Sequence, residues 1–124
     1  MTDVDEKVQQ LLKPMLKKHL FVVISKAIGT QEEMRPHFQE HLQYMNQLEA
    51  EGRLFASGPF PQEGIIVGDG LTILYAQSFD EAESLIKAEP LTKLGLRRYE
   101  LRLWELREGR MNITLNASTS TYSL

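Results

Sequence analysis

The sequence predicts an α+β domain in which two helices cover one face of a four-stranded antiparallel sheet. Three observations indicate this class. Runs of β-branched and aromatic residues alternate with segments of helical periodicity, their order is β-α-β-β-α-β, and the composition is that of one globular domain. The chain has 124 residues, of which 42% are hydrophobic and 25% are charged. A chain of this length can bury a core but leaves little interior for a deep cleft.

Charge and cysteine content exclude several classes of function. The formal net charge is −3, whereas a nucleic-acid-binding surface needs clustered Lys and Arg; the one basic cluster, Arg97–Arg98, is interpreted as a strand end. The absence of cysteine excludes disulfides, thiolate nucleophiles and Cys-based metal sites. The N-terminus starts acidic and contains no long apolar run, so neither a signal peptide nor a membrane span is expected. We therefore expect a cytoplasmic protein with no nucleic-acid or membrane partner.

Residues 1–18 are expected to form a helical extension in front of the domain. Apolar residues recur at helical spacing, which predicts a short amphipathic helix over residues 3–13 that ends near Pro14. The next run, HLFVVIS at residues 19–25, is continuously apolar with β-branched and aromatic residues and predicts a buried strand. The domain is expected to begin with this strand and to extend over residues 19–108.

Thr30 and Glu33 have the spacing of a capping box and predict the start of the first helix of the domain. Pro36 removes one backbone hydrogen bond from a helix interior, so two arrangements stay open. Either the helix kinks at Pro36, or Pro36 takes the first helical position of a second piece. In both arrangements residues 37–51 are helical.

The second and third strands are predicted on either side of a glycine-rich segment. Gly52 ends the helix, and residues 53–57 are predicted to form a short strand. Residues 58–61, Gly-Pro-Phe-Pro, are predicted to be a turn. Residues 62–70 contain three glycines and are expected to be a loop or a hairpin, and residues 71–78 are the predicted third strand.

The last two elements of the domain are a helix and a long strand. Residues 79–89 carry acids early and a lysine late, the order that the helix dipole favours. Residues 97–107 alternate polar and apolar side chains and predict a fourth strand. The tail, residues 109–124, adds a possible edge strand at residues 113–115. This element order is the ferredoxin-like βαββαβ pattern.

The predicted sheet is too apolar to leave its second face in water. A second copy that packs sheet against sheet would cover this face, so we expect a homodimer. The apolar strand residues on which this expectation depends are Phe21, Val23, Ile73, Tyr75, Leu101 and Leu103.

The stretch HFQEH, residues 37–41, formally matches the H-x-x-E-H pattern of some zinc peptidases. On a helical wheel His41 falls inside an apolar arc, whereas Glu40 faces solvent. A metallopeptidase would also need a further ligand on another helix and a cleft between lobes, so no metal is expected. From the residues alone, a core histidine that bonds a backbone carbonyl stays open as an alternative to catalysis. The apolar arc consists of Phe38, Leu42, Met45 and Leu48.

A set of short motifs keeps a specific spacing over about residues 19–107. The set consists of Arg35-Pro36, His41-Leu42, Glu51-Gly52-Arg53-Leu54, Ser57-Gly58-Pro59, Glu81-Ala82, Glu89-Pro90 and Gly95. Together these motifs resemble the YciI-like (YCII-related) family. The resemblance implies a dimeric α/β barrel, in a superfamily that includes muconolactone isomerase and chloromuconolactone dehalogenase. It also implies a catalytic pair of His41 and Glu89, in which Glu89 takes the place of the family's aspartate and Leu91 that of an aromatic residue.

These residues indicate a cofactor-free enzyme that transfers protons. An inward histidine beside a carboxylate at a helix C-terminus would be held in one tautomer and could take a proton next to a carbonyl group. The substrate is expected to contact Arg35, Ser57, Gly58 and Pro59, with backbone donors of the predicted turn directed at a developing oxyanion.

The expected chemistry is isomerisation, dehalogenation or another elimination on a small cyclic acid, lactone or quinone. No phosphate loop, dinucleotide fingerprint or Ser-His-Asp constellation occurs in the sequence, so no cofactor is expected. Two alternatives stay open on the same scaffold: a non-catalytic module that binds a small molecule, and an oxygen-dependent monooxygenase.

Overall fold

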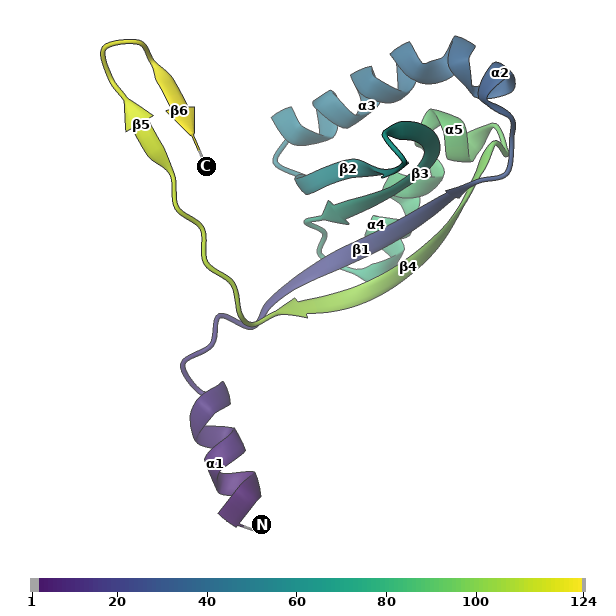
Figure 1. The fold of residues 1–124 in the computed structure, drawn as a ribbon. Coiled ribbons are helices and arrows are strands. Elements are labelled where there is room, and N and C mark those ends of the chain that lie inside the picture. Colours follow the sequence, from purple (N-terminus) through teal and green to yellow (C-terminus); the bar gives the residue numbers. More distant parts are fainter. Residues whose placement is uncertain (1–2, 124) are drawn as a thin grey trace. The chain divides into compact units, whose positions relative to one another are not determined.

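The computed structural model describes residues 3–123 and divides into two units (Figure 1). One unit comprises residues 19–105, and the other comprises the segments before residue 19 and after residue 105. Helix α1, Asp3–Leu12, lies in the unit formed by the two end segments. The first two residues of the expected N-terminal extension lie outside the described residues. None of the described helices is both long and apolar enough to cross a membrane.

The larger unit contains a four-stranded antiparallel sheet with the strand order β2-β3-β1-β4. Both β1 and β2 run antiparallel to β3. The α+β class and the sheet are therefore confirmed, and the arrangement is consistent with a ferredoxin-like fold. Its elements are β1 (Lys18–Ala27), α2 (Gln31–Met34), the 3₁₀ turn η1 (Arg35–His37), α3 (Phe38–Ala50), β2 (Leu54–Gln62), β3 (Ile65–Leu74), α4 (Phe79–Lys87), α5 (Pro90–Lys93) and β4 (Arg97–Leu106).

The capping box at the start of α2 is confirmed. The Glu33 backbone N–H donates to the Thr30 hydroxyl at 3.1 Å, and the Thr30 backbone N–H donates to the Glu33 carboxylate at 2.9 Å. Pro36 lies in the first turn of η1, which separates α2 from α3. The structure therefore agrees better with the second predicted arrangement, in which Pro36 starts a separate helical piece. Proline lacks the N–H that a continuous helix would need at this position.

The prediction of a turn at residues 58–61 is wrong, because β2 continues through this segment to Gln62. The chain instead turns at Glu63 and Gly64, whose φ angles are +50° and +78°. Strand β3 accordingly starts at Ile65 and ends at Leu74, rather than spanning residues 71–78. The prolines in β2 are tolerated because β2 is an edge strand, where a missing N–H does not interrupt a central ladder.

The core lies between the sheet and the helices. Alternation along the strands turns Phe21, Val23 and Leu74 toward the helices, where all three are buried. The other face leaves apolar side chains exposed, such as Ile24, which is 42% exposed. One predicted core residue is misplaced: Leu42 is 58% exposed, because the buried arc of α3 is narrower than the wheel indicated. The helix side chains of the core are Met45, Leu48, Ala82, Leu85 and Ile86.

A strand forms in the tail close to the expected residues 113–115, but it does not extend the main sheet. Strand β5, Thr114–Asn116, pairs instead with β6, Thr121–Ser123, in a separate two-stranded sheet. The pairing partner is local because a short turn, in which Ser120 has a φ of +53°, folds the tail back on itself.

Candidate active site

Glu89 is a buried carboxylate that starts helix α5. Its backbone is extended, Pro90 takes the first helical position, and its side chain accepts hydrogen bonds from the N–H groups of Leu91 at 3.0 Å and Thr92 at 2.9 Å. The Thr92 hydroxyl adds a third bond at 2.8 Å. Glu89 directly follows Ala88, the C-cap of α4, so it lies at a helix C-terminus as expected, and it also caps the N-terminus of α5. A carboxylate at this end is stabilised by the free N–H groups and the helix dipole.

His41 projects from α3 onto this carboxylate. Its Nδ1 atom lies 2.6 Å from Glu89 Oε1, a distance typical of a charge-assisted hydrogen bond. The His41 side chain is 20% exposed and that of Glu89 is 2% exposed. The structure thus brings together the two residues that the sequence singled out, with the longer glutamate reaching both the histidine and the backbone of α5.

Hydrogen bonding fixes the charge of Glu89. Burial alone would raise the pKa of Glu89, but bonds from His41, Leu91 and Thr92 together lower it to about 2. Each carboxylate oxygen accepts two of the four bonds, which occupies the acceptor sites of the group. An ionised carboxylate cannot donate, so the proton shared with His41 belongs to Nδ1. In the neutral ring this leaves the lone pair on Nε2, to which no described residue bonds.

Arg97 is a site residue that the sequence interpretation missed. Its Nε atom is buried without a hydrogen-bond partner in the described part of the chain. Burial lowers the pKa of the Arg97 guanidinium, while the charges of Glu89 and Asp69 oppose this effect. A signal was present, since Arg97 begins the alternation that turns Tyr99 and Leu101 toward the core.

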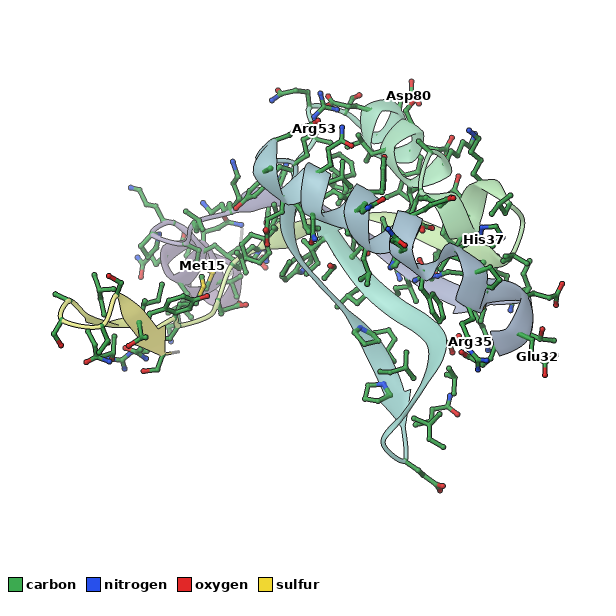
Figure 2. The ribbon with its side chains drawn as sticks, turned by 90° about the horizontal axis from the view of Figure 1, so that it is seen from above. Met15, Glu32, Arg35, His37, Arg53 and Asp80 are labelled. Atoms are coloured by element: carbon green, nitrogen blue, oxygen red, sulfur yellow. The ribbon has the colours of Figure 1, made fainter. Side chains whose placement is uncertain are left out.

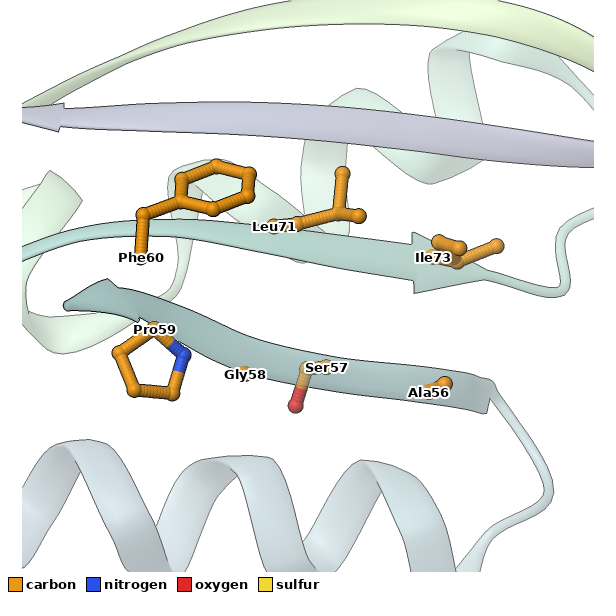
Figure 3. A pocket seen from close by; sticks show the side chains of 7 residues that line it. All are labelled: Ala56, Ser57, Gly58, Pro59, Phe60, Leu71 and Ile73. Atoms are coloured by element: carbon orange, nitrogen blue, oxygen red, sulfur yellow. The ribbon is translucent and has the colours of Figure 1, made fainter.

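The predicted substrate-binding residues of β2 lie at the sheet edge, where they line a 230 Å³ pocket (Figure 3). Figure 3 shows Ser57 and Pro59 on one side of β2, with Phe60 and Leu71 on the other. Ser57 pairs with the buried Thr72, so it shares the helix-facing side of the sheet. Pro59 pairs with Gly70 and shares that side too, so this segment presents strand backbone rather than a turn.

The remaining candidates are not part of this cluster. Arg35 is exposed in η1 (Figure 2) and forms none of the bonds to the His41–Glu89 pair. His37 is half-buried at the start of α3, and Glu40 is exposed, as predicted. Across residues 3–123, no group of three or more His, Cys, Asp or Glu side chains is placed to hold a metal ion.

Comparison with known proteins places this geometry in context. The YCII-related domain matches residues 19–105. The uncharacterized protein YjpA of Bacillus subtilis (strain 168) is 25% identical over 89 residues, which are 72% of this chain and 100% of YjpA. The solved structure of 5-chloro-2-hydroxyhydroquinone dehydrochlorinase (TftG) from Burkholderia phenoliruptrix AC1100, in complex with 2,5-dihydroxybenzoquinone, is similar with a TM-score of 0.60. That likeness has 26% sequence identity over 68% of this chain and 92% of the other.

The domain match covers well over half of the chain and coincides with the unit that carries the sheet, the histidine and the carboxylate. The similar structure agrees in fold over nearly all of its own length. The chain therefore belongs to the YCII-related family, within the dimeric α/β barrel superfamily, as the spacing of its motifs indicated.

Proposed function

We propose that the protein is a cofactor-free enzyme in which His41 moves a proton on a small cyclic acid, lactone or quinone. The observation that carries this proposal is the 2.6 Å contact between His41 Nδ1 and a buried Glu89 carboxylate whose pKa is lowered to about 2. A carboxylate that stays ionised keeps the histidine proton on Nδ1 and leaves Nε2 to act as the base. Glu89 is then a positioning residue, and His41 is the catalytic one.

Elimination of hydrogen chloride from a chlorinated hydroxyhydroquinone is one reaction that suits this pair, and the likeness to a dehydrochlorinase supports it. His41 would take a ring hydroxyl proton and return it to the chlorine-bearing carbon, which gives the keto tautomer. Removal of a second hydroxyl proton then breaks the C–Cl bond, whose electron pair leaves with chloride. The net loss is HCl, and the ring reaches the quinone level without an external oxidant. Without a leaving group, the first step alone is an isomerisation.

A substrate screen with matched variants tests this proposal. Chlorinated hydroxyhydroquinones, lactones and muconate derivatives are offered, and chloride release and ultraviolet absorbance are recorded. We expect His41→Ala to lower kcat/KM about 10²–10⁴-fold, because a positioned base contributes about that much. Glu89→Gln should cost less, since the proton acceptor remains. His37→Ala, four residues earlier and outside the pair, serves as the control and should keep the wild-type rate.

Two outcomes would contradict the proposal. Turnover that survives His41→Ala in a folded protein would show that another group moves the proton. Binding of these compounds without any turnover would favour the non-catalytic binding module instead. Thermal unfolding of each variant separates lost chemistry from lost fold.

We also propose that two copies of the chain associate through the open face of the sheet. This face carries a 410 Å³ hollow lined largely by apolar side chains of three strands. Ile24 is 42% exposed there and Trp104 37%. Contiguous apolar surface of this kind is typical of an interface. The hollow is lined by Val22, Ile24, Leu71, Ile73, Arg102, Leu103 and Trp104.

A further inference from the structure

The helix-facing side of the sheet becomes less apolar toward Arg97, whose guanidinium interacts electrostatically with Glu89 of the pair. Toward one end it is apolar, but the register places Pro59, Gly70 and Ser25 opposite one another in a row across β2, β3 and β1. Ser25 is 2% exposed and Gly70 is also buried. Arg97, on β4, reaches the same row, because its Nη2 atom lies 3.3 Å from the position that a Cβ on Gly70 would occupy. This end of the sheet therefore carries small side chains and one guanidinium group.

Gly70 leaves the room that the guanidinium uses. A Cβ at this position would lie 3.0 Å from the Gly58 carbonyl oxygen as well as 3.3 Å from Arg97 Nη2. The backbone of Gly70 is outside the positive-φ region, so its conformation alone does not require glycine. The absent side chain therefore leaves room both for the backbone of β2 and for the guanidinium of Arg97.

The guanidinium of Arg97 has no carboxylate partner among the described residues. Glu89 is one candidate partner for the guanidinium, but its carboxylate already accepts four hydrogen bonds, which fill its acceptor sites. Asp69 is engaged through Oδ1 by the Ala27 N–H at 2.9 Å. Arg97 forms no ion pair within 4.0 Å with any described residue, and so with neither of these carboxylates. With its Nε also unpartnered, the guanidinium has donors left for a ligand.

We propose that Arg97 binds an anionic oxygen of the substrate, so that the substrate class is that of ring compounds with an ionised hydroxyl or carboxyl group. This inference rests on the proposed function and specifies its substrate. Taking a hydroxyl proton leaves negative charge on oxygen, and a fixed guanidinium stabilises that charge by donating N–H hydrogen bonds to it. A neutral lactone would make no use of this group, whereas a phenolate, an enolate or a carboxylate would.

Equilibrium binding of a matched pair of probes tests the inference. The anionic probe is 2,5-dihydroxybenzoquinone, and the neutral probe is its 2,5-dimethoxy analogue, which has no ionisable hydroxyl group. We expect Arg97→Gln to weaken binding of the anion about tenfold to a hundredfold and to leave the neutral probe unchanged within twofold. Arg97→Lys keeps the charge but not the planar fork, so it should bind with intermediate affinity. The control is Arg98→Gln, which changes the exposed neighbouring residue.

Binding that does not depend on Arg97 would overturn the inference. This includes a wild-type protein that binds the neutral probe as tightly as the anion, one that binds neither, and an Arg97→Gln variant that keeps its affinity for the anion. Failure of the proposed function looks different: the anion would still bind through Arg97, but no substrate of the screen would turn over. Thermal unfolding without ligand confirms that each variant is folded before its affinity is compared.

Discussion

At the scale of single residues, Glu89 links the stability of the fold to the candidate site. Oε1 accepts bonds from His41 and Leu91, and Oε2 accepts two from Thr92. An N-cap residue normally has a short side chain; the extra methylene of glutamate still permits capping of α5 while the same group reaches His41. Any change at Glu89 should therefore alter both the free energy of unfolding and the orientation of the histidine.

The pH dependence of stability reveals this role. The folded-state pKa of Glu89 is lowered from 4.5 to about 2, so its contribution to stability is present above about pH 4.5 and is lost as pH falls through about 2. We expect Glu89→Gln to lower the free energy of unfolding by about 3 kcal/mol at pH 7, with a difference from wild type that shrinks below pH 4.5. Urea unfolding over a pH series measures this difference. A difference independent of pH would contradict the assignment.

At the scale of elements, local patterns predicted most helices and strands, and the hairpin shows where they fail. The capping box at Thr30 and the alternation of β4 depend on neighbouring residues, so the sequence reveals them. The strand through residues 58–61 is different. Gly and Pro favour turns locally, and only the edge position of β2, which is a tertiary property, allows a strand there.

Two glycines of this hairpin offer a matched test of backbone strain and packing. Gly64 has a φ of +78° with open space around it, whereas Gly68 has a φ of +99° and a Cβ there would lie 2.6 Å from Met34 Cε and 2.9 Å from Ala27 Cβ. We expect Gly64→Ala to cost about 1 kcal/mol, from strain alone. Gly68→Ala should cost about 1–3 kcal/mol more, because it also crowds its neighbours. Urea unfolding compares the two; equal costs would rule out the packing contribution.

The parts of the site differed in how far the sequence revealed them. His41 could be predicted because helical periodicity turned it inward, and Glu89 could be predicted because its spacing resembles a family pattern. The expected substrate contacts at Ser57 depended on a turn, and the structure has strand β2 at this position instead. Arg97 was missed because its proposed role depends on Gly70 in another strand and on the filled acceptor sites of Glu89, and a linear pattern reveals neither.

At the scale of the whole molecule, the two faces of the sheet differ in what covers them. One face is covered by α3 and α4, while the other exposes Ile24 and Trp104. Burial of such residues contributes about 25 cal/mol per Å² of apolar area, which favours association of two such faces. The proposed dimer depends on the composition of this exposed face, and the proposed chemistry depends on the His41–Glu89 pair on the helix side.

A single charge on the open face tests the proposed dimer. We expect the wild-type protein to sediment as a dimer at micromolar concentration and Ile24→Asp to sediment as a folded monomer, because the interface would bury an unpaired carboxylate. Leu42→Asp is the control, since Leu42 is 58% exposed on α3, away from the open face. A wild-type monomer, or a dimer that persists in Ile24→Asp, would refute sheet-to-sheet association.

The most direct test of the central claim, that Glu89 holds the His41 proton on Nδ1 and leaves Nε2 as the base, is ¹⁵N nuclear magnetic resonance of the histidine rings. We expect neutral His41 to show a protonated Nδ1 and an unprotonated Nε2, and Glu89→Gln to remove this preference. His19 is the internal comparison, because its Nε2 lies 3.1 Å from Glu105 and its side chain is 60% exposed. A neutral His41 protonated on Nε2, or a tautomer unchanged in Glu89→Gln, would contradict the account.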